Sequence, residues 1–310
     1  MNIVFLDSKT VGDIPNLKNL KSLGDVTMYP VTRPDQTAER IRDADIIITN
    51  KVVIHRELME QTPSLKQICI AATGMNNVDL EAAKENGIEV KNVSGYASDS
   101  VAQATFAMIL HLEQNLYFYD HFVKSGQYSK SGIFTNHDRP FRQLKGKCMG
   151  IIGLGNIGRS VAGIAEAFGM EVNYFSTSGI NDNQIYRRVN LDELLESSDI
   201  VSIHSPLNEN TRGLIGWSEL NRMKKSALLI NTGRGGIVIE KDLARAIDQE
   251  IISGAALDVF MNEPIEPDNP LLKLKDNSKL LMVPHIAWAS VEARTELMEG
   301  VIKNIKEFII

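Results

Sequence analysis

The sequence contains few cysteines, no long apolar segment and no excess of basic residues. Its two cysteines, Cys69 and Cys148, both fall within apolar, strand-like runs. We therefore expect two buried free thiols rather than a disulfide or a metal pair, which suits the reducing cytoplasm. No apolar run is long enough to cross a membrane, and the N-terminus lacks the basic flank of a signal peptide. These scarcities predict a cytoplasmic protein without a bound metal ion.

Positive charge is also scarce, since 33 lysines and arginines face 39 aspartates and glutamates, giving a net charge of −6. This balance argues against nucleic acid or an anionic membrane as the main partner, and an anionic substrate would need a local cationic site. The hydrophobic content of 43% and the charged content of 23% are typical of globular proteins. A chain of 310 residues exceeds one ordinary hydrophobic core, so we expect two domains.

Short apolar runs alternate with helical patterns along the chain. The runs that predict strands are 3–6, 26–29, 46–49, 67–71 and 89–93, then 149–152, 171–175, 200–204, 227–231, 254–259 and 280–283. Such alternation is typical of α/β folds in which helices cover both faces of a parallel sheet. We predict two doubly wound domains, with residues 1–98 and 287–310 in one and residues 99–286 in the other. The helical pattern 290–310 would return to cover the first domain.

A glycine-rich turn follows the first expected strand of the second domain. Gly153, Gly155 and Gly158 have the G-x-G-x-x-G spacing, with Asn156 and Ile157 between them, and a helical pattern comes next. In a dinucleotide-binding fold the first glycine allows the tight turn, the second lets the pyrophosphate approach the backbone, and the third lets helix and strand pack closely. The start of the helix would offer free N–H groups to the phosphates. The turn therefore predicts a dinucleotide site.

The second strand of this domain ends without the acidic residue that usually binds the adenosine ribose of NAD. Ser176 occupies that position and Thr177 follows it. Neither residue would repel the 2′-phosphate of NADP, although the next arginines, Arg187 and Arg188, lie a loop further along the chain. We expect NAD as the cofactor, and the sequence leaves NADP open.

Further motifs extend the pattern through the second half of the chain. They are residues 204–207 with Thr211, 231–235, 256–260, 263–264 and 284–287, which read HSPL, NTGRG, ALDVF, EP and PHIA. Together with the glycine turn, these motifs make the chain resemble the D-isomer-specific 2-hydroxyacid dehydrogenases over essentially its whole length. The resemblance implies a flavodoxin-like substrate domain and a Rossmann NAD(P)-binding domain, with the active site in the cleft between them. It also implies a homodimer.

Members of this family reduce 2-keto acids, or oxidise D-2-hydroxy acids, with a nicotinamide cofactor. Residues 100–106 and 285–288 are most similar to the hydroxypyruvate reductase, or glycerate dehydrogenase, branch. Reduction of hydroxypyruvate or glyoxylate is therefore expected, with D-lactate or another D-2-hydroxy acid as the alternative substrate. An alternative of another class is an NAD(H)-sensing binding protein such as a corepressor, because fold alone does not establish catalysis.

Three residues are candidates for the chemistry. Arg234, between two glycines at the end of an expected strand, can bind a carboxylate with two parallel hydrogen bonds. His285, held by Pro284 after the last expected strand, is the proton donor by position and by resemblance. A carboxylate beside it would favour the imidazolium, the form that can give up a proton. Glu263 and Glu266 both precede prolines, and the family motif selects Glu263 because it comes soon after the ALDVF strand.

The resemblance assigns further contacts. The backbone at Gly74 and Met75, in a loop of the first domain, resembles the family's second carboxylate contact. Asp258 corresponds to a residue that contacts the nicotinamide carboxamide, and His204 to a structural residue on the cofactor side. The remaining expected cofactor contacts are Pro206, Thr211, Thr232, Arg234 and His285.

Overall fold

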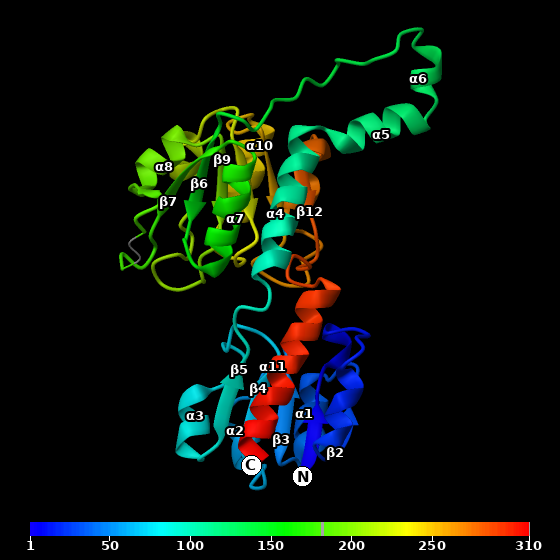
Figure 1. Cartoon of the computed structure of the whole chain (residues 1–310), viewed down its shortest axis with the longest axis vertical. Helices are drawn as coiled ribbons and strands as arrows, with labels where there is room; N and C mark the ends of the chain where they lie inside the picture. Colours follow the sequence, from blue (N-terminus) through cyan, green and yellow to red (C-terminus); the bar gives the residue numbers. More distant parts are fainter. Residues whose placement is uncertain (181–182, 310) are drawn as a thin grey trace. The chain divides into compact units, whose positions relative to one another are not determined.

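The chain divides into two compact units, seen in a computed structural model that describes residues 1–180 and 183–309 (Figure 1). The first unit contains Met1–Ala97 and Ala289–Ile310, and the second contains Ser98–Trp288. These boundaries differ from the sequence-based ones by one residue at the first crossing and by two at the second. Each unit has its own parallel sheet covered by helices, which confirms the predicted α/β fold class.

The first unit is built around a five-stranded parallel sheet with the order β2-β1-β3-β4-β5. Its strands are β1 (Asn2–Phe5), β2 (Asp25–Met28), β3 (Ile46–Thr49), β4 (Gln67–Ile70) and β5 (Glu89–Asn92). Its helices before residue 98 are α1 (Pro34–Ile41), α2 (Arg56–Glu60) and α3 (Leu80–Glu85), with short 3₁₀ helices at Ser8–Thr10 and Leu17–Ser22. β3 and β4 are buried along their whole length because they are central strands. The order is that of flavodoxin-like folds.

The C-terminal helix α11 (Val291–Ile309) completes the first unit. Its buried residues recur at helical spacing and include Leu297, Val301 and Ile305. The side chain of Gln67 in β4 donates to the carbonyl oxygen of Asn304 at 3.3 Å, and Asn304 Nδ2 donates to the carbonyl oxygen of Asn92 at 3.1 Å. The last segment of the chain therefore packs with β4 and β5 of the first unit.

The second unit contains a seven-stranded parallel sheet with the order β12-β11-β10-β9-β6-β7-β8. Its strands are β6 (Cys148–Ile152), β7 (Glu171–Phe175), β8 (Arg187–Arg188), β9 (Ile200–Ile203), β10 (Leu228–Asn231), β11 (Gly254–Leu257) and β12 (Leu280–Met282). β8 escapes sequence analysis because its two exposed arginines give no apolar signal. The other strands lie where the apolar runs predict them.

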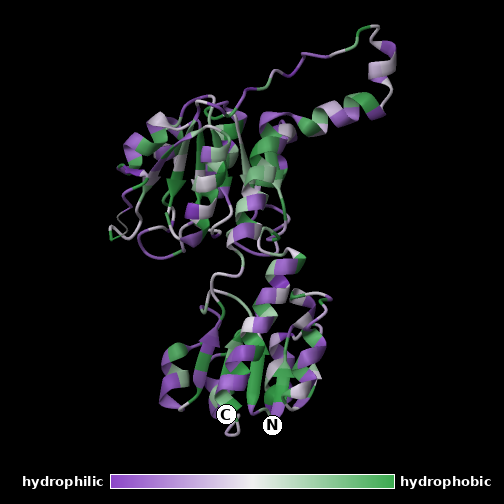
Figure 2. Cartoon of the chain, viewed as in Figure 1, coloured by the Kyte–Doolittle hydropathy of each residue, from purple (hydrophilic) through white to green (hydrophobic). Residues whose placement is uncertain are grey.

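Helices cover both faces of this sheet. The helices that pack on the sheet are α4 (Ser98–Glu113), α7 (Asn156–Ala167), α8 (Leu191–Ser197), α9 (Trp217–Arg222) and α10 (Glu240–Asp248). The unit also contains α5 (Leu116–Lys124), α6 (Gln127–Lys130) and 3₁₀ turns at Pro270–Lys273 and Asn277–Lys279. One core cluster joins the sheet to α4 and α7, and another joins it to α8, α9 and α10. The strands are correspondingly among the most apolar segments in Figure 2. Apolar side chains therefore cover both faces of the sheet, and the carboxyl ends of the strands remain available for function.

A segment that we call the arm (residues 114–142) extends away from the sheet of the second unit and contains α5 and α6 (Figures 1 and 2). Several of its apolar side chains are exposed, with Tyr117 at 69%, Phe134 at 90% and Phe141 at 57%. At this exposure Phe134 and Phe141 do not serve as core residues of the described chain.

Both thiols are free, with Cys69 buried in β4 and Cys148 partly buried at the start of β6. Burial raises the pKa of Cys69 to about 12, so this thiol is unreactive at neutral pH. Within the described residues, no helix is both long and apolar enough to cross a membrane. Nor do three or more potential metal ligands gather anywhere in that part of the chain.

Candidate active site

The residues that sequence analysis singles out in the second unit lie at one edge of its sheet. Because all the strands are parallel, their carboxyl ends meet at this edge. The residues that follow the strand ends, read across the sheet, are His285 after β12, Asp258 after β11, Arg234 after β10, His204 after β9, Gly153 after β6 and Ser176 after β7. The candidate arginine and histidine thus belong to one half of the edge, and the glycine turn belongs to the other half.

The three glycines of the turn after β6 differ in what they permit. Gly153 has φ +93°, and a Cβ there would lie 2.9 Å from the backbone nitrogen of Ser205. A Cβ at Gly158 would lie 2.3 Å from the carbonyl oxygen of Gly153, so this glycine allows helix and strand to pack closely. A Cβ at Gly155 would have no atom within 4 Å, and its φ of −78° suits any residue. The chain's own packing therefore does not require Gly155, and the space above it is open.

Two buried hydroxyl groups beside this turn have no hydrogen-bond partner in the described part of the chain. They are Ser176 Oγ after β7 and Ser205 Oγ after β9, the two strands that flank β6. Buried polar groups are normally hydrogen-bonded, so orphaned ones point to a missing ligand. Together with the open space at Gly155 and the start of the 12-residue helix α7, they fit a dinucleotide phosphate at the turn. Asn156 and Ile157 form the first turn of α7, and Thr177 is half-buried next to Ser176.

Arg234 lies in a turn that glycines and an asparagine hold rigidly. Its flanking glycines have no room for a side chain, since a Cβ at Gly235 would lie 1.7 Å from the carbonyl oxygen of Phe260. The Asn231 side chain accepts from Gly233 N–H at 3.0 Å and donates to the Arg234 carbonyl oxygen at 3.0 Å. Among the described residues the Arg234 guanidinium donates only to the carbonyl oxygen of Gly233. An exposed guanidinium without a carboxylate partner on a fixed turn is suited to bind an anionic ligand.

Glu263 and His285 form a direct ion pair. His285 Nδ1 lies 2.7 Å from Glu263 Oε2, while Glu263 Oε1 accepts from Phe260 N–H at 3.1 Å. The pair is mostly shielded, with the His285 side chain 22% exposed and that of Glu263 33%. The Glu263–Pro264 peptide bond is cis. Glu266, the competing acid, is exposed, and its side chain makes no hydrogen bond or ion pair in the described chain. The geometry thus places Glu263 at the histidine and leaves the other ring nitrogen, Nε2, for a ligand.

Asp258 braces the backbone that carries His285. His285 has φ +54°, a left-handed conformation that is unfavourable for a residue other than glycine. Its N–H donates to the Asp258 carbonyl oxygen at 2.8 Å, and Asp258 Oδ1 accepts from the N–H groups of Ile286 at 2.6 Å and Ala287 at 3.1 Å. Burial raises the pKa of Asp258 to about 6 despite these hydrogen bonds. The resemblance implies a carboxamide contact at Asp258, whereas this backbone role has no signal in the local sequence.

The remaining residues expected at the cofactor have structural contacts of their own. Thr211 is fully buried, and its hydroxyl donates to the carbonyl oxygen of Pro206 at 2.7 Å and accepts from Asn208 N–H at 2.8 Å. His204 Nε2 lies 2.8 Å from Ser202 Oγ, and His204 Nδ1 lies 3.3 Å from Thr232 Oγ1. Both ring nitrogens of His204 are therefore occupied within the protein. Burial lowers the pKa of His204 to about 3, so its imidazole is neutral at pH 7.

Gly74 and Met75 belong to the first unit, in the loop after the central strand β4. The loop is anchored by Val78 N–H, which donates to the Met75 carbonyl oxygen at 3.1 Å, and by Asn77 Nδ2, which donates to the Val52 carbonyl oxygen at 3.1 Å. No acceptor within the described residues binds the N–H groups of Gly74 and Met75. These two donors lie at the carboxyl edge of the first sheet, where α/β folds bind ligands.

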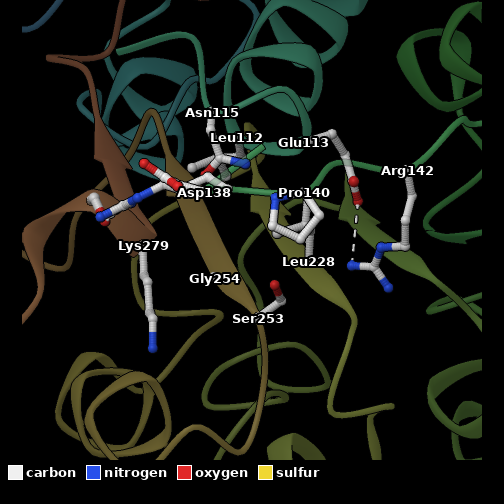
Figure 3. A pocket seen from close by; sticks show the side chains of 12 residues that line it. Leu112, Glu113, Asn115, Asp138, Pro140, Arg142, Leu228, Ser253, Gly254 and Lys279 are labelled. Carbon is white, nitrogen blue, oxygen red and sulfur yellow. Dashed lines mark hydrogen bonds and ion pairs between the residues drawn. The ribbon is translucent and has the colours of Figure 1, made fainter. Parts of the chain in front are cut away.

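A cavity of about 270 Å³ lies at the opposite, amino edge of the second sheet (Figure 3). Leu228 and Gly254, the first residues of β10 and β11, contribute to its lining. Glu113 pairs there with Arg142 at 3.9 Å, and burial raises the pKa of Glu113. None of the residues expected in the active site lines this cavity, so it is separate from the candidate site.

The chain is similar to known proteins over almost its whole length. The family model "D-isomer specific 2-hydroxyacid dehydrogenase, NAD binding domain" matches residues 106–287. A hydroxypyruvate reductase of Blautia hydrogenotrophica is 36% identical, over 100% of this chain and 97% of the relative. A glycerate dehydrogenase of Methylorubrum extorquens is 37% identical, over 89% and 86%. The crystal structure of D-lactate dehydrogenase from Aquifex aeolicus, complexed with NAD and lactic acid, aligns with a TM-score of 0.85 at 27% identity and covers 99% of this chain and 95% of its own.

The fold and this site define a nicotinamide-dependent oxidoreductase, with a dinucleotide turn and an acid–histidine pair on one sheet edge. The chain belongs to the D-isomer-specific 2-hydroxyacid dehydrogenase family. It uses NAD(H) and acts on the CH–OH group of 2-hydroxy acids or on the corresponding keto group.

Proposed function

We propose that this enzyme reduces a small 2-keto acid, hydroxypyruvate or glyoxylate, to the D-2-hydroxy acid. The observation that carries the proposal is the Glu263–His285 pair at the same sheet edge as the unpaired Arg234 guanidinium. The names of the relatives from Blautia hydrogenotrophica and Methylorubrum extorquens, hydroxypyruvate reductase and glycerate dehydrogenase, support this substrate class. The crystal structure of a glyoxylate reductase, 28% identical with a TM-score of 0.81, supports it as well.

The protein's part in the reaction is to hold an anionic substrate and to manage one proton. NAD(H), when bound, supplies or accepts the hydride. Arg234 binds the substrate carboxylate with its planar guanidinium. In the first unit, the N–H groups of Gly74 and Met75 are donors of the kind that bind a carboxylate. His285 donates a proton from Nε2 to the carbonyl oxygen, because Nδ1 is committed to Glu263. Glu263 stabilises the imidazolium and orients the ring, and in the oxidation direction the neutral ring accepts the proton.

We also propose how the cofactor is held. The pyrophosphate would lie at Gly153, Gly155 and the first turn of α7, and the adenosine end at Ser176 and Thr177. Thr211 with Pro206, and His204 with Thr232, would support the loops that face the nicotinamide end. Asp258 would add its carboxamide contact while it braces the His285 backbone.

The position of Arg188 supports a role for NADP beside NAD. Its Nη2 donates to the carbonyl oxygen of Gly179 at 3.0 Å, so the guanidinium reaches the loop that starts at Ser176. Ser176→Asp should then lower NADPH use sharply relative to NADH, because a carboxylate repels the 2′-phosphate. A wild-type enzyme that ignores NADPH would remove this phosphate role from the loop.

Steady-state kinetics with hydroxypyruvate, glyoxylate, pyruvate and phenylpyruvate, each with NADH and NADPH, tests the proposal. We expect hydroxypyruvate or glyoxylate to give the highest kcat/KM. A clear preference for pyruvate would favour a D-lactate dehydrogenase. Binding of NADH without turnover of any keto acid would favour a sensing protein instead.

A homodimer and a cytoplasmic location complete the proposal. The exposed aromatic residues of the arm, Tyr117, Phe134 and Phe141, support association with a second copy of the chain. The two free thiols are consistent with a reducing compartment.

A further inference from the structure

We propose that His204 and Thr105 are positioning residues, which tie the turn that carries Arg234 to helix α4 through a directed chain of buried hydrogen bonds. This inference rests on the proposed function, in which Arg234 binds the substrate carboxylate. It concerns residues that do not themselves touch the substrate.

The chain of hydrogen bonds crosses three elements of the second unit. It runs from Ser202 in β9 through His204 to Thr232 after β10, and from there to Thr105 in α4. The successive distances are 2.8 Å, 3.3 Å and 3.1 Å, and the Thr105 hydroxyl then reaches the Val101 carbonyl oxygen at 2.8 Å. Ser202, Thr232 and Thr105 are buried. Apolar side chains could occupy these buried positions, so a continuous series of hydrogen bonds indicates a specific role for the polar ones.

The direction of every bond in the chain follows from the carbonyl at its end. A carbonyl oxygen only accepts, so the Thr105 hydroxyl donates to Val101 and must accept from the Thr232 hydroxyl. The Thr232 hydroxyl donates its only proton to Thr105, so it accepts from His204 Nδ1–H. His204 Nε2 then accepts from the Ser202 hydroxyl. A neutral histidine with its proton on Nδ1 satisfies all these groups. The lowered pKa of His204 agrees with this assignment.

The same helix also holds the backbone beside the proton donor. Ser100, in the first turn of α4, donates from Oγ to the carbonyl oxygen of Ala287 at 2.7 Å. Ala287 N–H binds Asp258, and His285 precedes Ala287 by two residues. Helix α4 therefore anchors the Arg234 turn through Thr105 and the His285 loop through Ser100. A rigid helix that contacts both turns fixes the spacing between the carboxylate ligand and the proton donor.

Thr105→Val tests this series of hydrogen bonds, because valine keeps the shape of threonine and removes the hydroxyl. Thr105→Ser is the matched control, since it keeps the hydroxyl. We expect Thr105→Val to raise the KM for the keto acid, or to lower kcat, by about threefold to tenfold, the effect of one lost hydrogen bond. The Kd for NADH, measured by fluorescence titration, should change by less than about twofold. Thr105→Ser should restore the keto-acid kinetics.

A second pair of variants tests the donor-to-acceptor direction of these hydrogen bonds. His204→Asn places an amide N–H near the position of Nδ1 and can still donate to Thr232, whereas His204→Gln places its amide near Nε2. We expect His204→Asn to retain more keto-acid kcat/KM than His204→Gln. Because this series of hydrogen bonds contains no group that titrates near neutrality, the loss of keto-acid kcat/KM in each variant should be the same at every pH between 6 and 9.

Combination with Arg234→Lys separates failure of this inference from failure of the proposed function. If Thr105 acts through Arg234, the double variant should lose less than the product of the two single losses. Should Arg234→Lys alone leave keto-acid kinetics unchanged, the proposed function fails. If Arg234→Lys is impaired and Thr105→Val is not, the positioning role is overturned. It is also overturned if Arg234→Lys is impaired and Thr105→Val and Thr105→Ser lose thermal stability, NADH binding and turnover equally.

Discussion

Arg234 offers a cation that the protein itself leaves unpaired, on a turn that cannot move far. A substitution at this residue separates charge from shape. Arg234→Lys keeps the charge and loses the bidentate fork, so it should lower kcat/KM for keto acids. A hydrogen bond to a charged group contributes roughly 1.5–3 kcal/mol, which corresponds to about a tenfold to hundredfold loss. Cofactor affinity, measured by NADH fluorescence titration, should hardly change. Unchanged keto-acid kinetics would remove Arg234 from the site.

The Glu263–His285 pair predicts the pH dependence of turnover. Reduction consumes a proton that His285 delivers, so its rate should hold at low pH and fall at higher pH. Glu263→Gln keeps the shape of the side chain and removes the charge that stabilises the imidazolium. The alkaline decline of kcat/KM for reduction should therefore move to lower pH.

Glu266→Gln is the matched control for this pH profile. Glu266 also precedes a proline, but its side chain makes no hydrogen bond or ion pair in the described chain, so its substitution should leave the profile in place. A profile that moves in Glu266→Gln and not in Glu263→Gln would reverse the assignment of the acid. If neither variant moves it, the proposed pair does not govern proton transfer.

Asp258 predicts a pH dependence of stability rather than of chemistry. Its folded pKa of about 6 lies above the ordinary value of 3.8, so ionisation at this residue opposes folding. The stability associated with the protonated acid is present in full below pH 3.8 and is lost as the pH rises through about 6. Asp258→Asn removes this titration. Thermal unfolding of the two proteins from pH 4 to pH 7 should therefore show the wild type losing roughly 1–3 kcal/mol relative to the variant. A pH-independent difference would contradict the raised pKa.

The glycine turn and helix α7 act together as an element, and their glycines can be told apart experimentally. Gly155 and Gly163 both have open space where a Cβ would be, but Gly155 lies at the turn and Gly163 inside the helix. Gly163→Ala should stabilise the helix by about 0.5–1 kcal/mol and leave cofactor binding unchanged. Gly155→Ala should fold normally and weaken NADH binding by about tenfold or more, because its methyl group would occupy the pyrophosphate space.

Gly153→Ala completes this series as a test of fold rather than of binding. Its positive φ and the backbone of Ser205 leave no place for a methyl group, so thermal stability should fall. If Gly155→Ala bound NADH like the wild type, the open space at the turn would not be the phosphate site.

For the whole molecule, the exposed arm is the main feature that the single chain does not explain. Replacing Tyr117, Phe134 and Phe141 together with serine should convert a dimer into a monomer without unfolding either unit. Sedimentation velocity measures the mass, and far-ultraviolet circular dichroism monitors the fold. The matched control replaces Val31 and Val53 of the first unit, which are 58% and 59% exposed, with serine. A wild-type chain that is monomeric would refute the proposed dimer.

The sequence by itself determined those parts of the protein that depend on local patterns. Apolar runs located eleven strands of the described chain, and most of these are central parallel strands, which are apolar on both faces. The spacing of Gly153, Gly155 and Gly158 identified a strand–turn–helix, because Gly153 permits the turn and Gly158 permits the close packing of helix and strand. The two arginines of β8 carry no such pattern, so this strand was visible only in the folded sheet.

Only the tertiary structure decided which side chains meet. Glu263 and Glu266 have the same local context, each before a proline, so the resemblance was needed to select Glu263, and the folded loop shows it at His285. Thr105 and Thr232 are separated by 127 positions, so no periodicity could reveal their hydrogen bond. The Asp258 carboxylate accepts from the N–H group of Ile286, which is 28 positions away, so local sequence could not reveal this contact either. Local sequence governs backbone conformation and burial, whereas the direction and partner of a polar side chain depend on distant segments that only folding brings together.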